Sequence, residues 1–248
     1  MEFKIPKTIH YIWFGCASHT ALQERCLVSW KKYAPDYKII RWDETNCDIH
    51  ENLYVSQAYQ AKKWAFVADY FRFKILAEHG GFYLDVDIEL HQNIDFLCNH
   101  EAFYAFEKQD SVNAGIMGAI PGHPTVKTVL SSYLEDMFIK KNGGMNLLPV
   151  PVRVTKILRQ NGLVYGGKFQ ILKDYTAIYP VNVLTLNMGD NCCVAEHHYE
   201  FSWRDTKTVV SYKNYLVKEY HRNGPGANLK RMLKRIFLKL RIMGMAKL

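Results

Sequence analysis

The stretch Gly80-Gly81-Phe82-Tyr83-Leu84-Asp85-Val86-Asp87-Ile88-Glu89 decides the fold of this chain. After the two glycines, apolar and acidic residues alternate, which predicts a strand with one face in a core. The other face then carries carboxylates about 7 Å apart, at a rise of about 3.3 Å per residue. Two such carboxylates suit a hard divalent cation that keeps coordination sites open for phosphate oxygens. An exposed strand with an acidic solvent face explains these ten residues equally well.

A long helical run precedes the strand. Residues 57–79 contain no Gly or Pro, and Gly80 then stands where helices commonly end. Residues 64–77 are apolar on nearly every side, so this half of the run should be a buried helix. Asp69 and Arg72 lie three residues apart and share one face. Buried charges must be paired or must bind a ligand. Asp69 and Arg72 therefore form either a structural ion pair or a pair that holds hydroxyls of a polar ligand near a metal.

These two segments together carry a resemblance to a known family. The pattern is Ala68-Asp69-x-x-Arg72-x-x-x-Leu76-x-x-x-Gly80-Gly81-x-Tyr83-x-Asp85-Val86-Asp87. It resembles the signature of the DXD-containing sugar transferases of glycosyltransferase family 32, which includes bacterial capsular-polysaccharide enzymes. The catalytic domains of the large clostridial glucosylating toxins share this pattern. The resemblance implies a nucleotide-sugar transferase with the GT-A fold, an α/β, Rossmann-like architecture.

A first strand is predicted over residues 8–15, where Gly15 opens a loop at the strand's C-terminal edge. Ligands bind at that edge in open α/β sheets. Trp13 is therefore either a core aromatic or a flat surface for a base. Residues 9–15 are similar to the family's N-terminal motif, whose Trp packs on uracil, and this favours stacking for Trp13. The same resemblance implies that Tyr83 frames the nucleoside together with Trp13.

A run of small residues surrounds Asn113. The segment Asn113-Ala114-Gly115 would let a ligand approach the backbone closely, although an ordinary loop before a strand accounts for it as well. It matches an Asn-x-Gly segment of the family that lies against the donor sugar. The resemblance therefore implies a role for Asn113 in the catalytic site.

The third landmark, Glu196-His197-His198-Tyr199-Glu200-Phe201-Ser202-Trp203, contains adjacent histidines. Such a pair is commonly structural, but an imidazole can also complete a site that two carboxylates leave open. The segment resembles the family's late His-His-x-x-x-Ser-Trp motif, which closes over the diphosphate. The resemblance implies that His197 is the third metal ligand, with His198 as the alternative metal or phosphate contact. Ser202 and Trp203 are expected to cover the phosphates.

Composition limits the class of protein. The 248 residues are 48% hydrophobic and 14% aromatic, enough for one substantial α/β core and too apolar for a disordered chain. The N-terminus has no signal-peptide core and no run of 18 apolar residues occurs, from which we expect a cytoplasmic protein. Six scattered cysteines without a metal-binding spacing are expected to be free thiols.

The net charge of +8 is concentrated in the C-terminal tail. Residues 228–248 contain seven Lys or Arg and no acidic residue, which leaves 25 basic and 24 acidic residues in the rest of the chain. A nucleic-acid-binding protein would instead spread basic residues over a folded face, so we expect no nucleic-acid partner. We predict a catalytic domain over residues 1–225 and a basic amphipathic tail over residues 226–248, joined by a Gly-Pro-Gly hinge.

Apolar residues in the tail recur every three or four positions, at Leu229, Met232, Leu233, Ile236, Phe237, Leu240 and Met243. This spacing predicts one apolar helix face, with basic residues over the remainder. Such a helix either docks on the core or lies in a bilayer interface. Because an enzyme that builds polysaccharide on a lipid carrier works at a membrane, we expect the tail to hold it on the inner face of the cell membrane, against anionic lipid.

The sequence as a whole predicts a metal-dependent transferase that moves one sugar from a nucleotide-diphosphate sugar, preferably a UDP-sugar, to a saccharide or lipid-linked saccharide. Asp87 is expected to bind Mn²⁺ or Mg²⁺ directly, and Asp85 to act through the metal's water shell or the ribose. Asp69 and Arg72 are expected to hold sugar hydroxyls. The family is described as retaining, so the donor's α configuration should be kept. A GDP-mannose-type transferase and a nucleotide-sugar-binding protein without turnover stay open.

Overall fold

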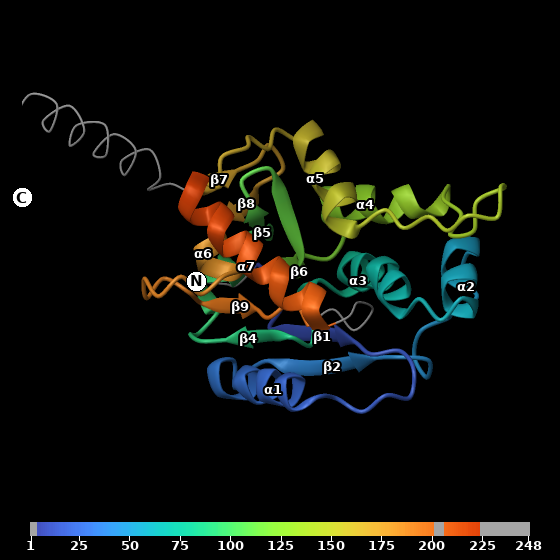
Figure 1. Cartoon of the computed structure of the whole chain (residues 1–248), viewed down its shortest axis with the longest axis horizontal. Coiled ribbons are helices and arrows are strands. Elements are labelled where there is room, and N and C mark those ends of the chain that lie inside the picture. The colour runs from blue at the N-terminus through green and yellow to red at the C-terminus, as the bar shows by residue number, and fades with distance from the viewer. Residues whose placement is uncertain (1–3, 201–205, 224–248) are drawn as a thin grey trace, which may run out of the picture.

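A seven-stranded sheet runs through the centre of the structure, a computed structural model that describes residues 4–200 and 206–223 (Figure 1). Helices cover both faces of this sheet, and a two-stranded ribbon accompanies it. The strands are β1 (Thr8–Ile12), β2 (Lys38–Trp42), β3 (Gly81–Leu84), β4 (Ile88–Leu90), β5 (Ala102–Lys108), β6 (Ser111–Ala119), β7 (Gln170–Ile171), β8 (Thr176–Tyr179) and β9 (Ala195–His197). The helices are α1 (Ala21–Tyr33), α2 (Leu53–Gln60), α3 (Trp64–His79), the 3₁₀ helix η1 (Asp95–Asn99), α4 (Pro124–Leu134), α5 (Val150–Gln160), α6 (Val181–Leu184) and α7 (Thr206–Asn223).

The sheet mixes parallel and antiparallel strands in the order β2-β1-β3-β6-β5-β8-β7. β1 pairs in parallel with both β2 and β3, and β5 pairs in parallel with β8. β6 is antiparallel to β3 and to β5. The carboxyl ends of β1, β2 and β3 therefore meet at one edge of the sheet, which is where open α/β sheets bind ligands. The α/β class predicted from the sequence is confirmed.

β3 is buried on both faces, which differs from the half-buried strand that the alternating sequence predicts. Tyr83 faces the core formed with α2, α3, α4 and α5, whereas Phe82 and Leu84 face the core on the side of α1. A central strand between two layers of helices has no solvent face, so apolar residues occupy both sides of it. The polar alternation begins only where this strand has ended.

The predicted continuous strand stops at Leu84, before the carboxylates. Residues 85–87 form a tight turn in which the Ile88 N–H donates to the Asp85 carbonyl at 2.9 Å. The chain then continues as β4, which leaves the main sheet and pairs with β9. The prediction that the two carboxylates share one strand face is therefore wrong, because both lie on a turn at the carboxyl edge of the sheet.

The helical run predicted over residues 57–79 is interrupted. α2 ends at Gln60 and α3 begins at Trp64, and between them Lys62 adopts the left-handed conformation with a φ of 54°. The second half of the run forms the mostly buried helix α3 as predicted. Gly80 ends α3 with a φ of 64° and a ψ of −158°, a conformation that is essentially restricted to glycine.

Substitution of Gly80 by Ala should lower the free energy of unfolding by about 1–3 kcal/mol. An added Cβ would meet the backbone N of Pro121 at 2.8 Å and the Ala119 carbonyl oxygen at 2.9 Å. Urea unfolding measures the loss. Gly143→Ala is the matched control, because Gly143 has a φ of 80° and no atom within 4 Å of the added Cβ. Equal losses in the two variants would show that packing around Gly80 contributes nothing.

Candidate active site

Three segments that are far apart in sequence meet at the carboxyl edge of the sheet. The turn after β3 supplies Asp85 and Asp87, and the neighbouring strand β6 supplies Asn113. β9 pairs with β4 directly after the turn, with His197 opposite Ile88. Figure 1 shows this β4–β9 ribbon in front of the sheet, between α1 and α7. The antiparallel pairing therefore brings the late histidine segment to the acidic turn.

Asp85, Asp87 and His197 form a cluster that could hold a metal ion. One oxygen of each carboxylate and one imidazole nitrogen all lie within 4.8 Å of one another. Asp87 and His197 are buried, and Asp85 is half-buried. Among the described residues this is the one group of three such ligands. Its mixture of two carboxylates and one imidazole is compatible with Mn²⁺.

Asp87 is held from several directions by the end of β9 and the residues after it. The N–H of Glu200 donates to Oδ2 at 2.7 Å, and the N–H of His198 donates to the Asp87 carbonyl at 3.0 Å. Nε2 of His197 lies 3.3 Å from Oδ1. Burial raises the pKa of Asp87, but the His197 imidazole and the backbone donors outweigh burial, and the net pKa is lowered. Asp87 is therefore a carboxylate at neutral pH, with Oδ1 facing the cluster.

Asp85 is fixed in the same way through one oxygen. Its Oδ1 accepts from the Tyr83 hydroxyl at 2.6 Å and lies 3.5 Å from the Arg72 guanidinium. A Cβ added at Gly115 would lie 2.6 Å from Oδ2 and 2.9 Å from Cε1 of His197, so Oδ2 and the imidazole both lie beside Gly115. Each carboxylate of the cluster thus has one oxygen bonded to the protein and one directed inward. This arrangement fits a shared cation.

Arg72 is a buried cation with several partners. Its guanidinium lies 2.8 Å from Asp69, donates to the Ala114 carbonyl at 2.7 Å and covers the Tyr83 ring at 4.7 Å. The side chains of Asp69 and Arg72 are only 10% and 6% exposed. Burial raises the pKa of Asp69 to about 6, and the charge of Arg72 offsets only part of that increase. The pair expected on α3 is present, and through Asp85 it is joined to the acidic turn.

Asn113 orients His197. Its Oδ1 accepts the Gly115 N–H at 2.6 Å, which turns Nδ2 toward Nδ1 of His197 at 3.1 Å. The amide therefore donates to Nδ1, and a neutral His197 carries its proton on Nε2, facing Asp87. For Nε2 to ligate a cation, the proton of the imidazole must lie on Nδ1 instead. The Asn113 side chain would then have to present its amide oxygen to Nδ1, so that the oxygen accepts a hydrogen bond from the Nδ1–H. The structure thus gives Asn113 a contact to the imidazole, where the sequence predicted a contact to the donor sugar.

The two residues predicted to frame the nucleoside differ in exposure. Trp13 is half-buried in the loop after β1; its Nε1 donates to the Ala17 carbonyl at 2.8 Å and its ring meets His19 edge-on. A partly exposed ring at this edge can stack on a base. Tyr83 is only 1% exposed, so its ring has no open face for a nucleoside. The structure gives Tyr83 the supporting role of a donor to Asp85.

His198 is directed to a different partner from His197. Its Nε2 lies 2.8 Å from the Glu89 carboxylate, and the amine of Lys213 on α7 lies 3.5 Å from its Nδ1. Of the two adjacent histidines, the structure therefore places His197 with the acidic turn. The two remaining residues predicted for this site, Ser202 and Trp203, lie outside the described residues.

Sequence reasoning missed three groups at the site. Tyr199 has a φ of 56°, uncommon for a residue other than glycine, and stacks its ring on His197 at 4.0 Å between centroids. Directly after this turn, the N–H of Glu200 reaches Asp87. Glu107 on β5 is a buried carboxyl group. Burial raises its pKa, and the charge of His197 offsets part of that increase. The identity of a residue does not reveal that its backbone N–H will bind a carboxylate or that a tyrosine will adopt a left-handed conformation. A single glutamate in an apolar strand, such as Glu107, is only a weak signal in the sequence.

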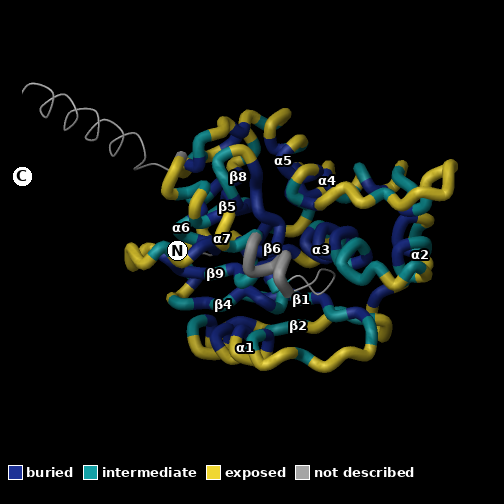
Figure 2. Tube along the Cα trace, in the orientation of Figure 1, coloured by how far each residue is buried: buried dark blue, intermediate teal, exposed yellow. Residues whose placement is uncertain are grey.

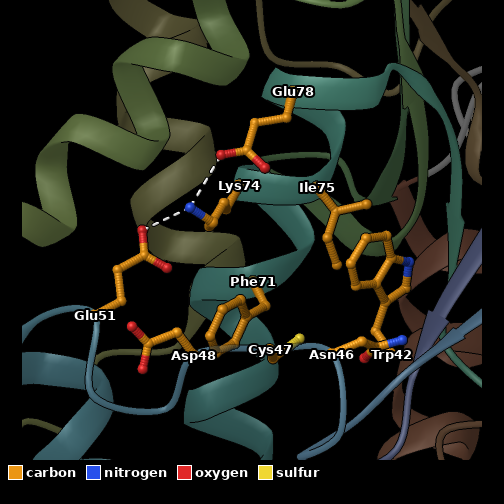
Figure 3. Close-up of a pocket in the computed structure, with 9 residues that line it drawn as sticks. All are labelled: Trp42, Asn46, Cys47, Asp48, Glu51, Phe71, Lys74, Ile75 and Glu78. Atoms are coloured by element: carbon orange, nitrogen blue, oxygen red, sulfur yellow. Dashed lines mark hydrogen bonds and ion pairs between the residues drawn. The ribbon is translucent and has the colours of Figure 1, made fainter.

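A separate cavity of about 340 Å³ lies between α3 and the segment that follows β2 (Figure 3). Lys74 and Glu78 line it from a face of α3 to which Asp69 and Arg72 do not belong. Lys74 is ion-paired with Glu51 at 2.8 Å and with Glu78 at 2.9 Å. Because Asp85, Asp87 and His197 do not line it, the cavity is not the candidate active site.

Residues 21–104 match the protein family described as "Glycosyltransferase sugar-binding region containing DXD motif". An uncharacterized glycosyltransferase of Acanthamoeba polyphaga mimivirus is 28% identical over 196 residues, which cover 73% of this chain and 70% of that protein. Inositol phosphoceramide mannosyltransferase 3 of Schizosaccharomyces pombe is 26% identical over 137 residues. That match covers 51% of this chain, and the chain spans only 36% of the length of the yeast protein.

Among solved structures, the PaToxG glycosyltransferase superposes with a TM-score of 0.50 at 17% sequence identity, over 63% of this chain and 68% of that one. This likeness concerns the fold, and it agrees with the GT-A architecture predicted from the sequence. The family match includes α3 and the whole acidic turn. Together these findings define the class of enzyme: the chain is a glycosyltransferase with a GT-A fold, and its DXD motif is Asp85-Val86-Asp87.

Replacement of Arg72 by Ala should lower the free energy of unfolding by roughly 3–5 kcal/mol, because it leaves buried Asp69 without its cation. Donor hydrolysis should fall as well, since Asp85 loses a neighbouring charge. Thermal unfolding followed by circular dichroism measures the first effect. Arg41→Ala is the control: Arg41 is paired with Asp43 at 2.9 Å but is 45% exposed, so the loss should stay within about 1 kcal/mol. An unchanged melting temperature in Arg72→Ala would contradict the buried pair.

Proposed function

We propose that this enzyme is a metal-dependent, retaining transferase of glycosyltransferase family 32 that moves a hexose from a nucleotide-diphosphate sugar, preferably a UDP-sugar. The observation that carries the proposal is the cluster of Asp85, Asp87 and His197, in which each carboxylate directs one oxygen inward. Two carboxyl groups, Asp69 and Asp85, lie against the single guanidinium of Arg72, and Asp87 adds a further negative charge to the cluster. A divalent cation would balance this excess of negative charge.

Asp85, Asp87 and His197 would hold Mn²⁺ or Mg²⁺, and the bound cation would stabilise negative charge on the diphosphate leaving group. The chain's own contribution is to fix these ligands before the donor binds. Tyr83 and Arg72 hold Asp85, and the backbone at Glu200 holds Asp87. Side chains that are locked by hydrogen bonds need little reorganisation during the reaction, which is the main requirement for electrostatic stabilisation.

The donor would lie along the carboxyl edge of the sheet. Trp13 would stack on the base, and Asp69, with Arg72 behind it, would hold sugar hydroxyls. His198, Ser202 and Trp203 would close over the diphosphate. The acceptor hydroxyl would attack the anomeric carbon on the face from which the diphosphate departs, and a phosphate oxygen would take the hydroxyl proton. The new glycosidic bond would then keep the donor's α configuration.

A mannosyl donor of the GDP type is the second candidate. The fission-yeast relative is named as a mannosyltransferase, and two budding-yeast relatives, 28% and 31% identical over 102 residues, are named as mannosyl phosphorylinositol ceramide synthases. Those names also support a lipid-linked acceptor over a free saccharide. The residues around Asp85 would treat either diphosphate in the same way, so the base pocket beside Trp13 would decide between uracil and guanine.

We further propose that residues 1–225 form the catalytic domain and that residues 226–248 hold it at the inner face of the cell membrane. The tail lies outside the described residues. The support for this proposal is its sequence, which combines a helical apolar spacing with seven basic residues. In the described part of the chain, no helix is both long and apolar enough to span a bilayer. A surface polysaccharide or a glycolipid built on a membrane-bound acceptor is the product that this placement favours.

Asp87→Asn should abolish both transfer and donor hydrolysis while the fold survives. The change removes one charge from the cluster with almost no change in volume, and Asp87 is the carboxylate whose Oδ1 faces His197. Hydrolysis of a UDP-sugar at saturating Mn²⁺ and calorimetric titration with Mn²⁺ measure the effect. Asp36→Asn, at an exposed position before β2, is the matched control and should behave as wild type. Activity of Asp87→Asn within a few-fold of wild type would refute the metal assignment.

Truncation after Ala227 should lower the affinity for anionic vesicles about tenfold or more and leave soluble donor hydrolysis intact. Each Lys or Arg near an anionic surface contributes about 1 kcal/mol, and the truncation removes seven of them with the apolar helix face. Sedimentation with phosphatidylglycerol vesicles, beside a hydrolysis assay, measures both properties. A truncated protein that binds vesicles with unchanged affinity would show that the tail makes no membrane contact, and one that unfolds would show that the tail is part of the fold.

A further inference from the structure

A second region of the chain exposes an unusual amount of apolar surface. Residues 137–173 comprise the loop after α4 from its third residue onward, helix α5, the following loop and β7. The first two residues of the loop after α4, Glu135 and Asp136, are acidic and lie outside this stretch. Of the fourteen large apolar side chains that are exposed in the described part of the chain, eight lie in this stretch. Met145, Leu147 and Leu148 precede α5, Val152 lies on it, and the others follow it. We refer to the exposed residues of this stretch as the α5 surface. Single exposed apolar residues are normal, but such a concentration indicates an interaction site.

The charges of the α5 surface all have one sign. Residues 137–173 contain seven Lys or Arg and no Asp or Glu, although the charges of residues 1–227 nearly cancel. Six of the seven are exposed: Lys140, Lys141, Lys156, Arg159, Lys168 and Lys173. The seventh, Arg153, is buried and ion-paired with Asp136. The outward charge of this stretch is therefore wholly positive and is interleaved with its apolar side chains.

The two loops and α5 make one continuous rim. Val152, Lys156 and Arg159 are exposed at spacings of four and three, so they follow one face of α5. In Figure 1 the loop before α5 reaches the right-hand edge of the molecule, and the loop after α5 lies along the upper edge. Figure 2 shows exposed residues along both loops, with α5 between them. Leu147 at one end is 55% exposed, and Val164 at the other is 65% exposed.

The chemistry of this rim favours a lipid bilayer over other partners. A second copy of the chain would bring six cations against six cations. A nucleic acid would call for aromatic rings to stack on bases, whereas five of the eight apolar side chains are Val, Leu or Ile and one is Met. Aliphatic side chains on loops, surrounded by lysines, match an interface in which acyl chains lie beneath anionic headgroups.

We propose that the α5 surface docks the catalytic domain on an anionic lipid bilayer. Leu147 and Leu148 on one loop, and Val164 and Phe169 on the other, would enter the headgroup region. The exposed lysines and Arg159 would bind lipid phosphates. This contact belongs to the described fold and is separate from the C-terminal tail, so it would fix which face of the domain lies on the membrane. It depends on neither the donor nor the metal.

The full-length protein tests this proposal by hydrogen–deuterium exchange, with vesicles of phosphatidylcholine alone and with vesicles that also contain phosphatidylglycerol. Anionic vesicles should slow exchange in residues 139–149 and 162–171, and neutral vesicles should slow it much less. Vesicle binding without protection of either segment would overturn the proposal, and so would a failure of the full-length protein to bind anionic vesicles.

A pair of double variants supplies the matched control. Leu147→Gln with Lys156→Glu changes one exposed apolar and one exposed basic residue of the α5 surface, and it should weaken vesicle binding about tenfold. Val28→Gln with Lys31→Glu makes the same changes on α1, where Val28 is 62% exposed, and should leave binding unchanged. Both variants should keep wild-type donor hydrolysis and melting temperature. Equal vesicle affinities for the two variants would overturn the proposal.

Discussion

The guanidinium of Arg72 is the interaction on which the rest of the site depends. It is a buried cation that contacts Asp69 on its own helix, the Ala114 carbonyl on β6, the Tyr83 ring on β3 and, at 3.5 Å, Asp85 on the acidic turn. One charge thus joins helix α3, two strands and the turn. Because an unpaired buried charge is costly, the loss of a charged partner would destabilise this arrangement of elements. Arg72 and the Tyr83 hydroxyl together orient Asp85, and with it one member of the cluster of Asp85, Asp87 and His197.

The second half of the site depends on the backbone. β9 brings His197 to the turn, Asn113 fixes the imidazole, and the left-handed conformation of Tyr199 comes just before the N–H that Glu200 donates to Asp87. Asp87 stays ionised while Asp69, buried beside a single cation, has a raised pKa. Carboxyl groups in one site therefore have different environments and different roles. Under the proposed function, the ionised Asp87 would bind a cation and Asp69 would serve in hydrogen bonding.

Much of this arrangement could be predicted from sequence where it depends on local spacing. The i, i+3 relation of Asp69 and Arg72, the glycine that ends α3 and the strand after it all follow from short-range geometry. The end of β3 at Leu84 could not be predicted, because the alternating pattern continues beyond it while the tertiary pairing changes partner. Neither could the burial of Tyr83, which depends on what packs against each face of β3. The choice of His197 over His198 rests on the family resemblance and not on local spacing. The α5 surface was equally hidden, because its loops have no regular period.

The most direct measurement of the central claim is donor hydrolysis by the wild-type protein over a panel of UDP- and GDP-sugars, with Mn²⁺ and after chelation. Hydrolysis needs no knowledge of the acceptor and reports the leaving-group chemistry at the acidic turn. The account predicts that one donor is hydrolysed, that activity disappears when the cation is removed, and that Mn²⁺ restores it. Hydrolysis that continues unchanged after chelation would contradict the claim that Asp85, Asp87 and His197 act through a bound cation.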